Sequence, residues 1–364
     1  MSAIDFTSPG VPDYAVPPGE TIREYLDELG MTQRELATRL DLSPKHVNRL
    51  VQGLVPLSAE IAQRLELVTG MPSRLWNRLE ADYQSTQQRL RLQEELTEAL
   101  PWLQEMPLRE LIRRGALPEE PKDRISRIQQ LLGFFGVAHL STWRDLYERP
   151  SAAFRQTKSF EAVPGAVASW LRLGELAARD IECRAFDPGG LRSALPRLRQ
   201  LTLQPPELIV PIMRDICAQS GVAVVFMSEV KGTRASGATR WLATDKVMLL
   251  LSLRYRTDDH FWFTFFHEIG HILLHGKGET WIDDEVAGGD PMEAEANRFA
   301  CDLLIPDSQA DRLRNLKSLE SVRAFARELG IAPGIVVGRL QHDGIWPRRQ
   351  GNGLRKKVTL ASDL

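Results

Sequence analysis

The chain has 364 residues, of which 43% are hydrophobic and 26% charged, and its formal net charge is −2. This composition is typical of a soluble globular protein, and the length favours two or three domains over a single core. The nearly neutral balance excludes a field that would draw the whole chain to nucleic acid or to an anionic membrane, so any DNA binding must come from a local surface.

Cysteine usage and hydropathy predict a cytoplasmic protein. Cys183, Cys217 and Cys301 are widely spaced and odd in number, which argues against a disulfide framework or a cysteine-rich zinc site. The N-terminal segment lacks the basic and apolar regions of a signal peptide. No run approaches the roughly 18 apolar residues of a membrane helix. We therefore expect no membrane span.

The first part of the chain is predicted to be helical. Residues 1–19 are rich in proline and glycine and indicate a flexible arm. Hydrophobic periodicity then predicts a longer amphipathic helix at 73–100, preceded by four short helices at about 20–29, 32–40, 44–51 and 58–69. This spacing is typical of a helix-turn-helix, so we expect residues 20–80 to form such a domain.

The third short helix is the candidate DNA-reading helix. Ser43 can cap it and Pro44 suits its first turn. Side chains that read base edges or phosphates occupy the outward positions. The predicted DNA contacts are Gln33, Ser43, Lys45, His46, Asn48 and Arg49. Residues 20–80 are not basic overall, so a protein-binding or dimerising unit is the alternative; a DNA-binding domain of this kind predicts a homodimer on a double-stranded operator.

The second part of the chain adds strands. Residues 81–205 read as a helical linker or middle domain, and the pattern changes after Pro205 and Pro206. The runs VAVVFM (222–227) and KVMLLLSL (246–253) predict strands with a loop between them, and the second could be an edge strand that pairs with an extended peptide. Helices are expected from about 258, at 291–305 and at 317–342. We predict a domain over 206–345 and a basic, mobile tail over 346–364.

Within this last helical region, FARELGIAPGIVVGRL (325–340) repeats the apolar spacing of LATRLDLSPKHVNRLV (36–51). It predicts a second helix-turn-helix-like unit that serves packing rather than DNA binding, because such units commonly pack without touching DNA.

The stretch FTFFHEIGHILLHG contains the pattern H-E-x-x-H. His267 and His271 are four residues apart on a predicted helix, so both imidazoles can reach one ion, while Glu268 points about 100° away, toward a water on that ion. Zinc suits such nitrogen and oxygen ligands and keeps an open position. The alternative is a core helix with satisfied histidines, but a buried His-Glu-His pattern without a metal would leave costly polar groups. The sequence thus predicts a Zn²⁺ site with Glu268 as general base.

The third ligand is expected from a later helix. His275 is roughly 12 Å beyond His267 along the helix axis, too far to share its ion. The stretch DPMEAEANRFACDLLIP offers Glu293 and Glu295. We favour Glu293, because Asn297 follows it by four residues on the same face and could support it, while Glu295 stays an alternative. Tyr255, His260 and His275 are candidates for contacts to an oxyanion or substrate, or are simply packed or exposed.

These motifs resemble two known families. The N-terminal module resembles the XRE-type helix-turn-helix, especially the HigA antitoxin branch. The segments GATRWL, LSLRY, DDHFWFTFFHEIGHILLH and EAEANRFACDLLIP resemble the ImmA/IrrE metallopeptidases. The resemblance implies a gluzincin-like fold with His267, His271 and Glu293 as ligands and Glu268 as base. It also implies helix-turn-helix repressors as substrates.

We therefore predict an α+β, mostly helical protein with a helix-turn-helix domain, a helical middle region and a zincin-like domain with a small sheet. The predicted function is a DNA-binding regulator with a zinc endopeptidase that cleaves a repressor, or itself, in a stress or toxin–antitoxin response, where a toxin would be a further partner. The alternative is a non-proteolytic antitoxin or regulator whose zinc fold senses a ligand or protein. A small-molecule amidase is a further, minor alternative.

Overall fold

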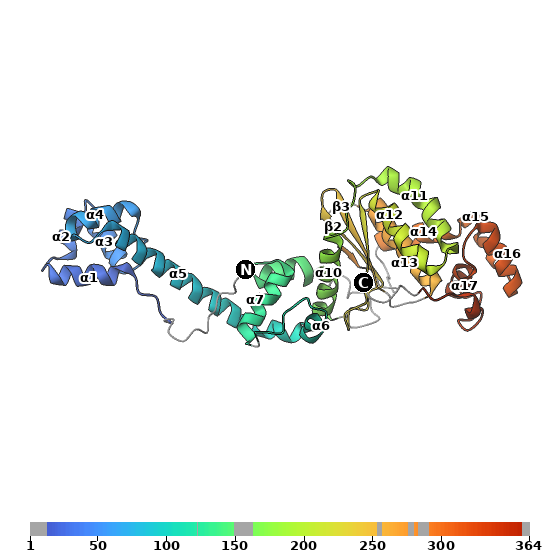
Figure 1. Ribbon diagram of the computed structural model, residues 1–364, viewed down its shortest axis with the longest axis horizontal. Coiled ribbons are helices and arrows are strands. Elements are labelled where there is room, and N and C mark those ends of the chain that lie inside the picture. Colours follow the sequence, from blue (N-terminus) through green and yellow to red (C-terminus); the bar gives the residue numbers. More distant parts are fainter. Residues whose placement is uncertain are drawn as a thin grey trace. The chain divides into compact units, whose positions relative to one another are not determined.

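In a computed structural model of the chain, the described residues are 13–121, 123–148, 163–252, 257–275, 280–282 and 291–358. The chain divides into two compact units (Figure 1). The first comprises Met1–Pro101 and Pro121–Gln129, and the second comprises Trp102–Glu120 and Gln130–Leu364. The domain boundaries inferred from the sequence stay predictions. Most of the predicted arm, residues 1–12, lies outside the described residues.

The first unit is helical, as expected. It contains α1 (Pro18–Glu28), α2 (Gln33–Arg39), α3 (Pro44–Val51), α4 (Ala59–Thr69) and α5 (Ser73–Glu98). Three helices begin at a capping hydroxyl that accepts a backbone N–H: Thr32 from Glu35, Ser43 from His46 and Ser58 from Ile61. A shared core holds α1 to α5 together and buries residues spaced at helical intervals, among them Ile22, Leu36, Leu40, Val47, Leu50, Leu65 and Trp76.

The second unit starts with short helical elements and then builds a sheet between helices. Before the sheet come η1 (Leu100–Glu105), α6 (Leu108–Arg113), α7 (Arg124–Phe135), α8 (Leu140–Trp143), η2 (Arg144–Glu148), α10 (Pro164–Arg179), α11 (Pro188–Gln200), η3 (Leu201–Leu203) and α12 (Pro206–Ala218). The first residues of η1 and the first half of α7 belong to the first unit. The strands are β1 (Val222–Phe226), β2 (Gly237–Ala243), β3 (Lys246–Leu251) and β4 (Thr280–Ile282). The helix α13 (Asp258–Leu274) lies between β3 and β4 in the chain. After β4 come α14 (Pro291–Leu304), α15 (Asp307–Leu313), α16 (Leu319–Leu329), α17 (Pro333–His342) and η4 (Asn352–Leu354).

The sheet has the order β1-β3-β2-β4, with β1 parallel to β3 and the other pairs antiparallel. Alternate side chains of β3 enter different cores. Val247, Leu249 and Leu251 pack with α12, α13 and α17, whereas Met248 and Leu250 pack with α10. The sheet therefore separates α10 from α12, α13 and α17 (Figure 1). The predicted α+β, mostly helical fold is confirmed, and no helix among the described residues is long and apolar enough to cross a membrane.

Two expectations about the strands were wrong. The run over 246–253 is not an edge strand, because β3 pairs with β1 on one side and β2 on the other, which leaves none of its ladder for a peptide. β2 was not predicted. Its pairing with β3 and β4 comes from residues distant in sequence, which a local pattern does not report.

The prediction of a mobile tail over 346–364 was also wrong for its described part. Trp346, Leu354 and Val358 are buried, and Thr257 forms a β-bridge with Lys357. Arg355 pairs with Asp259 at 2.7 Å. The basic residues that suggested mobility thus include the counter-ion of an acid at the start of α13. Residues 359–364 lie outside the described part of the chain.

The start of α13 also makes folding sensitive to pH. Asp258 is buried, and burial together with the neighbouring Asp259 raises the pKa of its carboxyl from 3.8 to about 6. An acid with a raised pKa in the folded state holds a proton that the unfolded chain has lost. Its contribution to stability is therefore present below about pH 4 and disappears as pH rises through 6.

We expect Asp258→Asn to remove this dependence, because an amide keeps the oxygen that accepts from the backbone N–H groups of Asp259 and Lys356, both at 3.1 Å. Between pH 4 and 7 the wild type should lose up to about 3 kcal/mol of unfolding free energy relative to the variant. Denaturant unfolding at a series of pH values measures the difference. Parallel pH profiles for the two proteins would contradict the assignment.

Candidate functional site

The helix α13 positions the two histidines of the H-E-x-x-H pattern. Its apolar side chains, including Trp262, Phe265, Phe266 and Ile269, are buried in the core shared with β1, β3 and α17. The helix has apolar residues on almost every side, as expected for a helix at the centre of a domain. His267, Glu268 and His271 are therefore buried as well. A glycine brings the next helix close: a Cβ on Gly270 would lie 3.2 Å from the Cα of Ala296 in α14.

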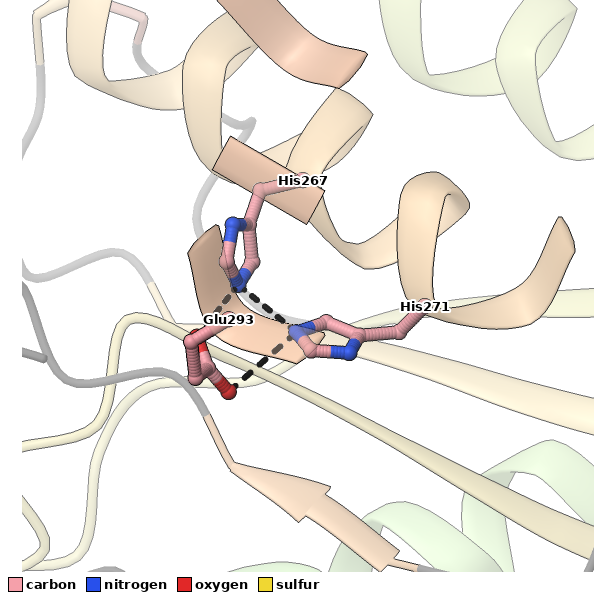
Figure 2. A group of neighbouring side chains, drawn as sticks. All are labelled: His267, His271 and Glu293. Carbon is pink, nitrogen blue, oxygen red and sulfur yellow. Dashed lines mark hydrogen bonds and ion pairs between the residues drawn. The ribbon is translucent and has the colours of Figure 1, made fainter. Parts of the chain in front are cut away.

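This close crossing places Glu293 of α14 beside both histidines (Figure 2). The two Nε2 atoms of His267 and His271 lie 2.9 Å apart. The carboxylate of Glu293 spans the pair, with Oε2 at 3.2 Å from His267 Nε2 and Oε1 at 3.3 Å from His271 Nε2. One possible ligand atom from each residue lies within 4.8 Å of the others. These three residues form a His/Glu group that could hold a metal ion.

The protonation states of this group suit a cation. Burial lowers the pKa of His271, which favours a neutral ring. Burial alone would raise the pKa of Glu293, but the hydrogen bonds from His267 and His271, together with the positive charge that these rings carry when protonated, lower it to about 2. Asn297 Oδ1 lies 3.0 Å from Nδ1 of His267, where it accepts a hydrogen bond from the protonated Nδ1, so that the lone pair of the neutral ring is on Nε2. The nitrogen that faces Glu293 is thus the one whose lone pair could coordinate a metal ion.

Glu268 lies against the first residue of β2. A Cβ on Gly237 would overlap Oε1 of Glu268 and would lie 2.8 Å from its Cγ. Only a residue without a side chain leaves room for this carboxylate. Gly237 therefore leaves the space that the glutamate of the H-E-x-x-H pattern occupies, and this role was not predicted from the sequence. No local signal marks it, because the contact depends on the packing of β2 under α13.

The other acidic candidate takes a different place. Glu295 is half-exposed and its Oε2 lies 3.4 Å from Nε2 of His275, so Glu293 and not Glu295 joins the two histidines. Asn297 was expected to support Glu293, whereas the structure pairs it with His267. The signal that selected Asn297, a polar residue on the same face of α14, was sound, but its partner depended on the approach of α13.

The three candidates for oxyanion or substrate contacts lie in different surroundings. His275 stands behind His271, with the two Nδ1 atoms 2.9 Å apart, on the side away from Glu293. His260 is in the first turn of α13, where its Nε2 lies 3.9 Å from Oδ2 of Asp259. Tyr255 lies outside the described residues.

The predicted DNA-contacting residues lie on α2, on α3 and at the turn between them. Gln33, Lys45, Asn48 and Arg49 are exposed, and Ser43 caps α3 by accepting from the N–H of His46 at 3.1 Å. His46 was expected to be exposed, but it is half-buried and its Nε2 atom is inaccessible. The turn itself uses Asp41 in a left-handed conformation with φ of 54°.

The repeated spacing over 325–340 also forms a helix-turn-helix-like unit. Gly330 has φ of 69°, matching Asp41 in the first unit. The positions that correspond to Lys45 and Arg49 are Gly334 and Gly338. A Cβ on either would overlap or closely approach the carboxylates of Asp258 and Asp259. The second unit thus packs its would-be reading helix onto α13, as expected for a role in packing.

Comparison with known proteins identifies both regions. Residues 22–76 match the helix-turn-helix family and residues 217–341 match the IrrE N-terminal-like domain of peptidase family M78. The chain belongs to the helix-turn-helix regulators and carries an IrrE N-terminal-like domain. The predicted XRE-type and ImmA/IrrE resemblances are confirmed.

Individual relatives match the N-terminal domain. An uncharacterised HTH-type transcriptional regulator, YddM, from Escherichia coli (strain K12) is 36% identical over 63 residues, which are 17% of this chain and 67% of that protein. The solved structure of the Pseudomonas aeruginosa antitoxin HigA with the higBA promoter is 29% identical and covers 20% of this chain and 82% of its own, with a TM-score of 0.20. These matches show that the chain is a DNA-binding helix-turn-helix regulator with a peptidase-family M78 domain.

Proposed function

We propose that this chain is a transcription regulator whose IrrE N-terminal-like domain is a zinc-dependent endopeptidase. The observation that supports it best is the convergence of His267, His271 and Glu293, together with a buried Glu268 that directly follows His267 in sequence. A helix that only filled a core would have no need of this arrangement, because each buried polar group is costly unless it is satisfied. A glutamate base beside a two-histidine, one-carboxylate group suits the hydrolysis of an amide.

The donor set fits zinc. Two imidazole nitrogens and one carboxylate are the three protein ligands of many catalytic zinc sites, which keep a fourth position open. When bound, zinc would act as a Lewis acid and lower the pKa of a coordinated water. His267 and His271 would hold it through Nε2, and Glu293 through its carboxylate. Because the pKa of Glu293 is lowered to about 2, this carboxylate carries its negative charge at neutral pH.

Glu268 then has the role of moving a proton. It accepts the proton of the attacking water and donates it to the departing amine as the peptide bond breaks. The carboxylate lies against Gly237 in a buried environment, which limits the positions open to it. A base held in this way needs little reorganisation during the reaction.

We expect Gly237→Ala to slow hydrolysis by about 100-fold, because the new methyl group would displace the carboxylate by a substantial fraction of an ångström or more. Zinc affinity should not change, since the three ligands lie elsewhere. Steady-state kinetics and zinc stoichiometry test both statements. Gly133→Ala is the matched control, because that helical glycine has open space around its Cβ position. Wild-type kinetics in Gly237→Ala would contradict the placement of Glu268.

We infer the substrate class from the two regions together. A helix-turn-helix domain on the same chain would bring the peptidase to DNA-bound proteins, so a helix-turn-helix repressor, or this chain itself, is the proposed substrate. The proposed setting is a stress or toxin–antitoxin response in the cytoplasm, with a toxin as a further partner. A homodimer on a two-fold operator is proposed because one such domain contacts only a half-site.

Mass spectrometry of new protein N-termini tests the proposal. The comparison is made in cells with and without stress. Cells that carry the wild type should show new termini that are missing from cells with Glu268→Gln. Their sequences would name the substrate and the cleaved bond. Identical sets of termini, despite one zinc per purified chain, would overturn the peptidase and favour a regulator that binds without cutting.

If α3 contacts DNA, removing a basic side chain from this helix should weaken DNA binding. We expect Arg49→Ala to weaken binding by about 1–3 kcal/mol if the guanidinium reads a guanine, and to lower the salt slope if it contacts a phosphate. The probe is a duplex selected from a random pool by the wild type, and fluorescence anisotropy at several salt concentrations gives both quantities. Arg78→Ala removes the same charge from an arginine that is 79% exposed on α5. Equal losses in the two variants would contradict a specific role for α3.

A further inference from the structure

His275 leaves the helix and turns back on a histidine of the H-E-x-x-H pattern. Its backbone is extended, with φ of −106° and ψ of 151°, while its N–H still donates to the carbonyl of His271 at 3.1 Å. The ring is almost fully buried. Its Nδ1 lies 2.9 Å from Nδ1 of His271, and its Nε2 lies 3.4 Å from Oε2 of Glu295. Three residues thus form a row behind the candidate metal centre: Glu295, His275 and His271.

The row admits one arrangement of protons if His271 coordinates through Nε2. That nitrogen must then offer a lone pair, so the proton of the His271 ring is on Nδ1. Two nitrogens at 2.9 Å require one donor and one acceptor, so Nδ1 of His275 accepts. The proton of His275 is therefore on Nε2, where it faces the carboxylate of Glu295. Each group in the row determines the direction of the next hydrogen bond.

We propose that His275, oriented by Glu295, is a positioning residue that fixes the tautomer and ring orientation of His271 for metal binding. The proposal rests on the zinc site of the proposed function. In that site the two histidine ligands would be hydrogen-bonded to different kinds of partner. His267 has an amide acceptor, Asn297, at 3.0 Å, whereas His271 has an imidazole backed by a carboxylate. The carboxylate makes His275 a stronger acceptor and so makes His271 a more basic ligand.

A pair of nearly isosteric replacements tests this role. Asparagine places an oxygen where Nδ1 of His275 stands and can accept from His271, while leucine has a similar shape and cannot. We expect His275→Leu to lower zinc affinity by about 10- to 100-fold and His275→Asn to restore most of it. Competition with a chromogenic chelator measures the affinity of the full chain. Thermal unfolding of the zinc-free protein should give similar midpoints for the two variants, because their packing is alike.

Equal zinc affinities for His275→Leu and His275→Asn would overturn the proposal. Glu295 offers a second test that does not threaten folding, because its side chain is 52% exposed. Glu295→Leu should cause a smaller loss than His275→Leu, and Glu295→Gln, which keeps an acceptor oxygen, should lose less still. Equal zinc affinity in both Glu295 variants and the wild type would show that the Glu295 carboxylate does not orient His275.

The same assay separates this inference from the proposed function. If the wild type binds zinc no more tightly than Glu293→Ala, the metal site itself is wrong and the role of His275 falls with it. If Glu293→Ala loses zinc while His275→Leu and His275→Asn match the wild type, the metal site stands and the positioning role alone is wrong.

Discussion

Replacing Glu268 by glutamine is expected to lower the rate of peptide hydrolysis by about 10²- to 10⁴-fold, the usual contribution of a general base. Glutamine has the same size and fits the space that Gly237 leaves, but it cannot take a proton from water. Zinc content should stay at one per chain, because the amide replaces no ligand. Turnover of the substrate identified from its new N-termini, together with metal analysis of the same sample, measures both.

Glu320→Gln is the matched control, because it makes the same chemical change at an exposed position in the first turn of α16. It should retain wild-type turnover. Full activity in Glu268→Gln would show that another group takes the proton, and the buried position of Glu268 would then need a structural explanation.

The second large effect is expected at the third ligand. Glu293→Ala should lower zinc affinity by more than the roughly 10- to 100-fold that a supporting partner costs, because it removes a donor and the negative charge between two histidines. Zinc at 100 times its Kd should stabilise the wild type by about 2.7 kcal/mol and leave the variant almost unchanged. Isothermal calorimetry and thermal unfolding with and without zinc provide the two measurements.

Glu295→Ala separates the two acidic candidates. The structure places Glu295 against His275, so this variant should keep most of the zinc affinity that Glu293→Ala loses. If Glu295→Ala lost as much zinc as Glu293→Ala, or more, the assignment of the third ligand would have to be reversed.

Local sequence patterns predicted the helices well. The N-terminal helices follow from apolar residues at helical spacing, and the hydroxyl caps at Thr32, Ser43 and Ser58 mark where three of them begin. The helix with the H-E-x-x-H pattern was expected because His267 and His271 share one of its faces. In each case the deciding interactions lie within about one turn of the residue concerned, so neighbouring residues are sufficient to predict them.

Pairings between distant segments were predicted poorly. β3 is an apolar run that would suit a central or an edge strand, and only its pairing with both β1 and β2 decides between them. The tail after residue 345 was expected to be mobile because it is basic, but the charge of Arg355 is matched by Asp259, which is remote in sequence. Charge in one segment does not reveal whether an opposite charge from another segment is placed beside it.

The candidate site divides in the same way. The sequence by itself determined the two histidines, the glutamate between them and a choice of two acids, because these depend on residue type and helical periodicity. The tertiary structure alone decided that Glu293 completes the group, that Asn297 contacts His267, that His275 stands behind His271 and that Gly237 makes room for Glu268. Those four contacts depend on how α13 packs against α14, on the turn at its end and on the strand beneath it. Such distances are set by packing in three dimensions and are not encoded in spacing along the chain.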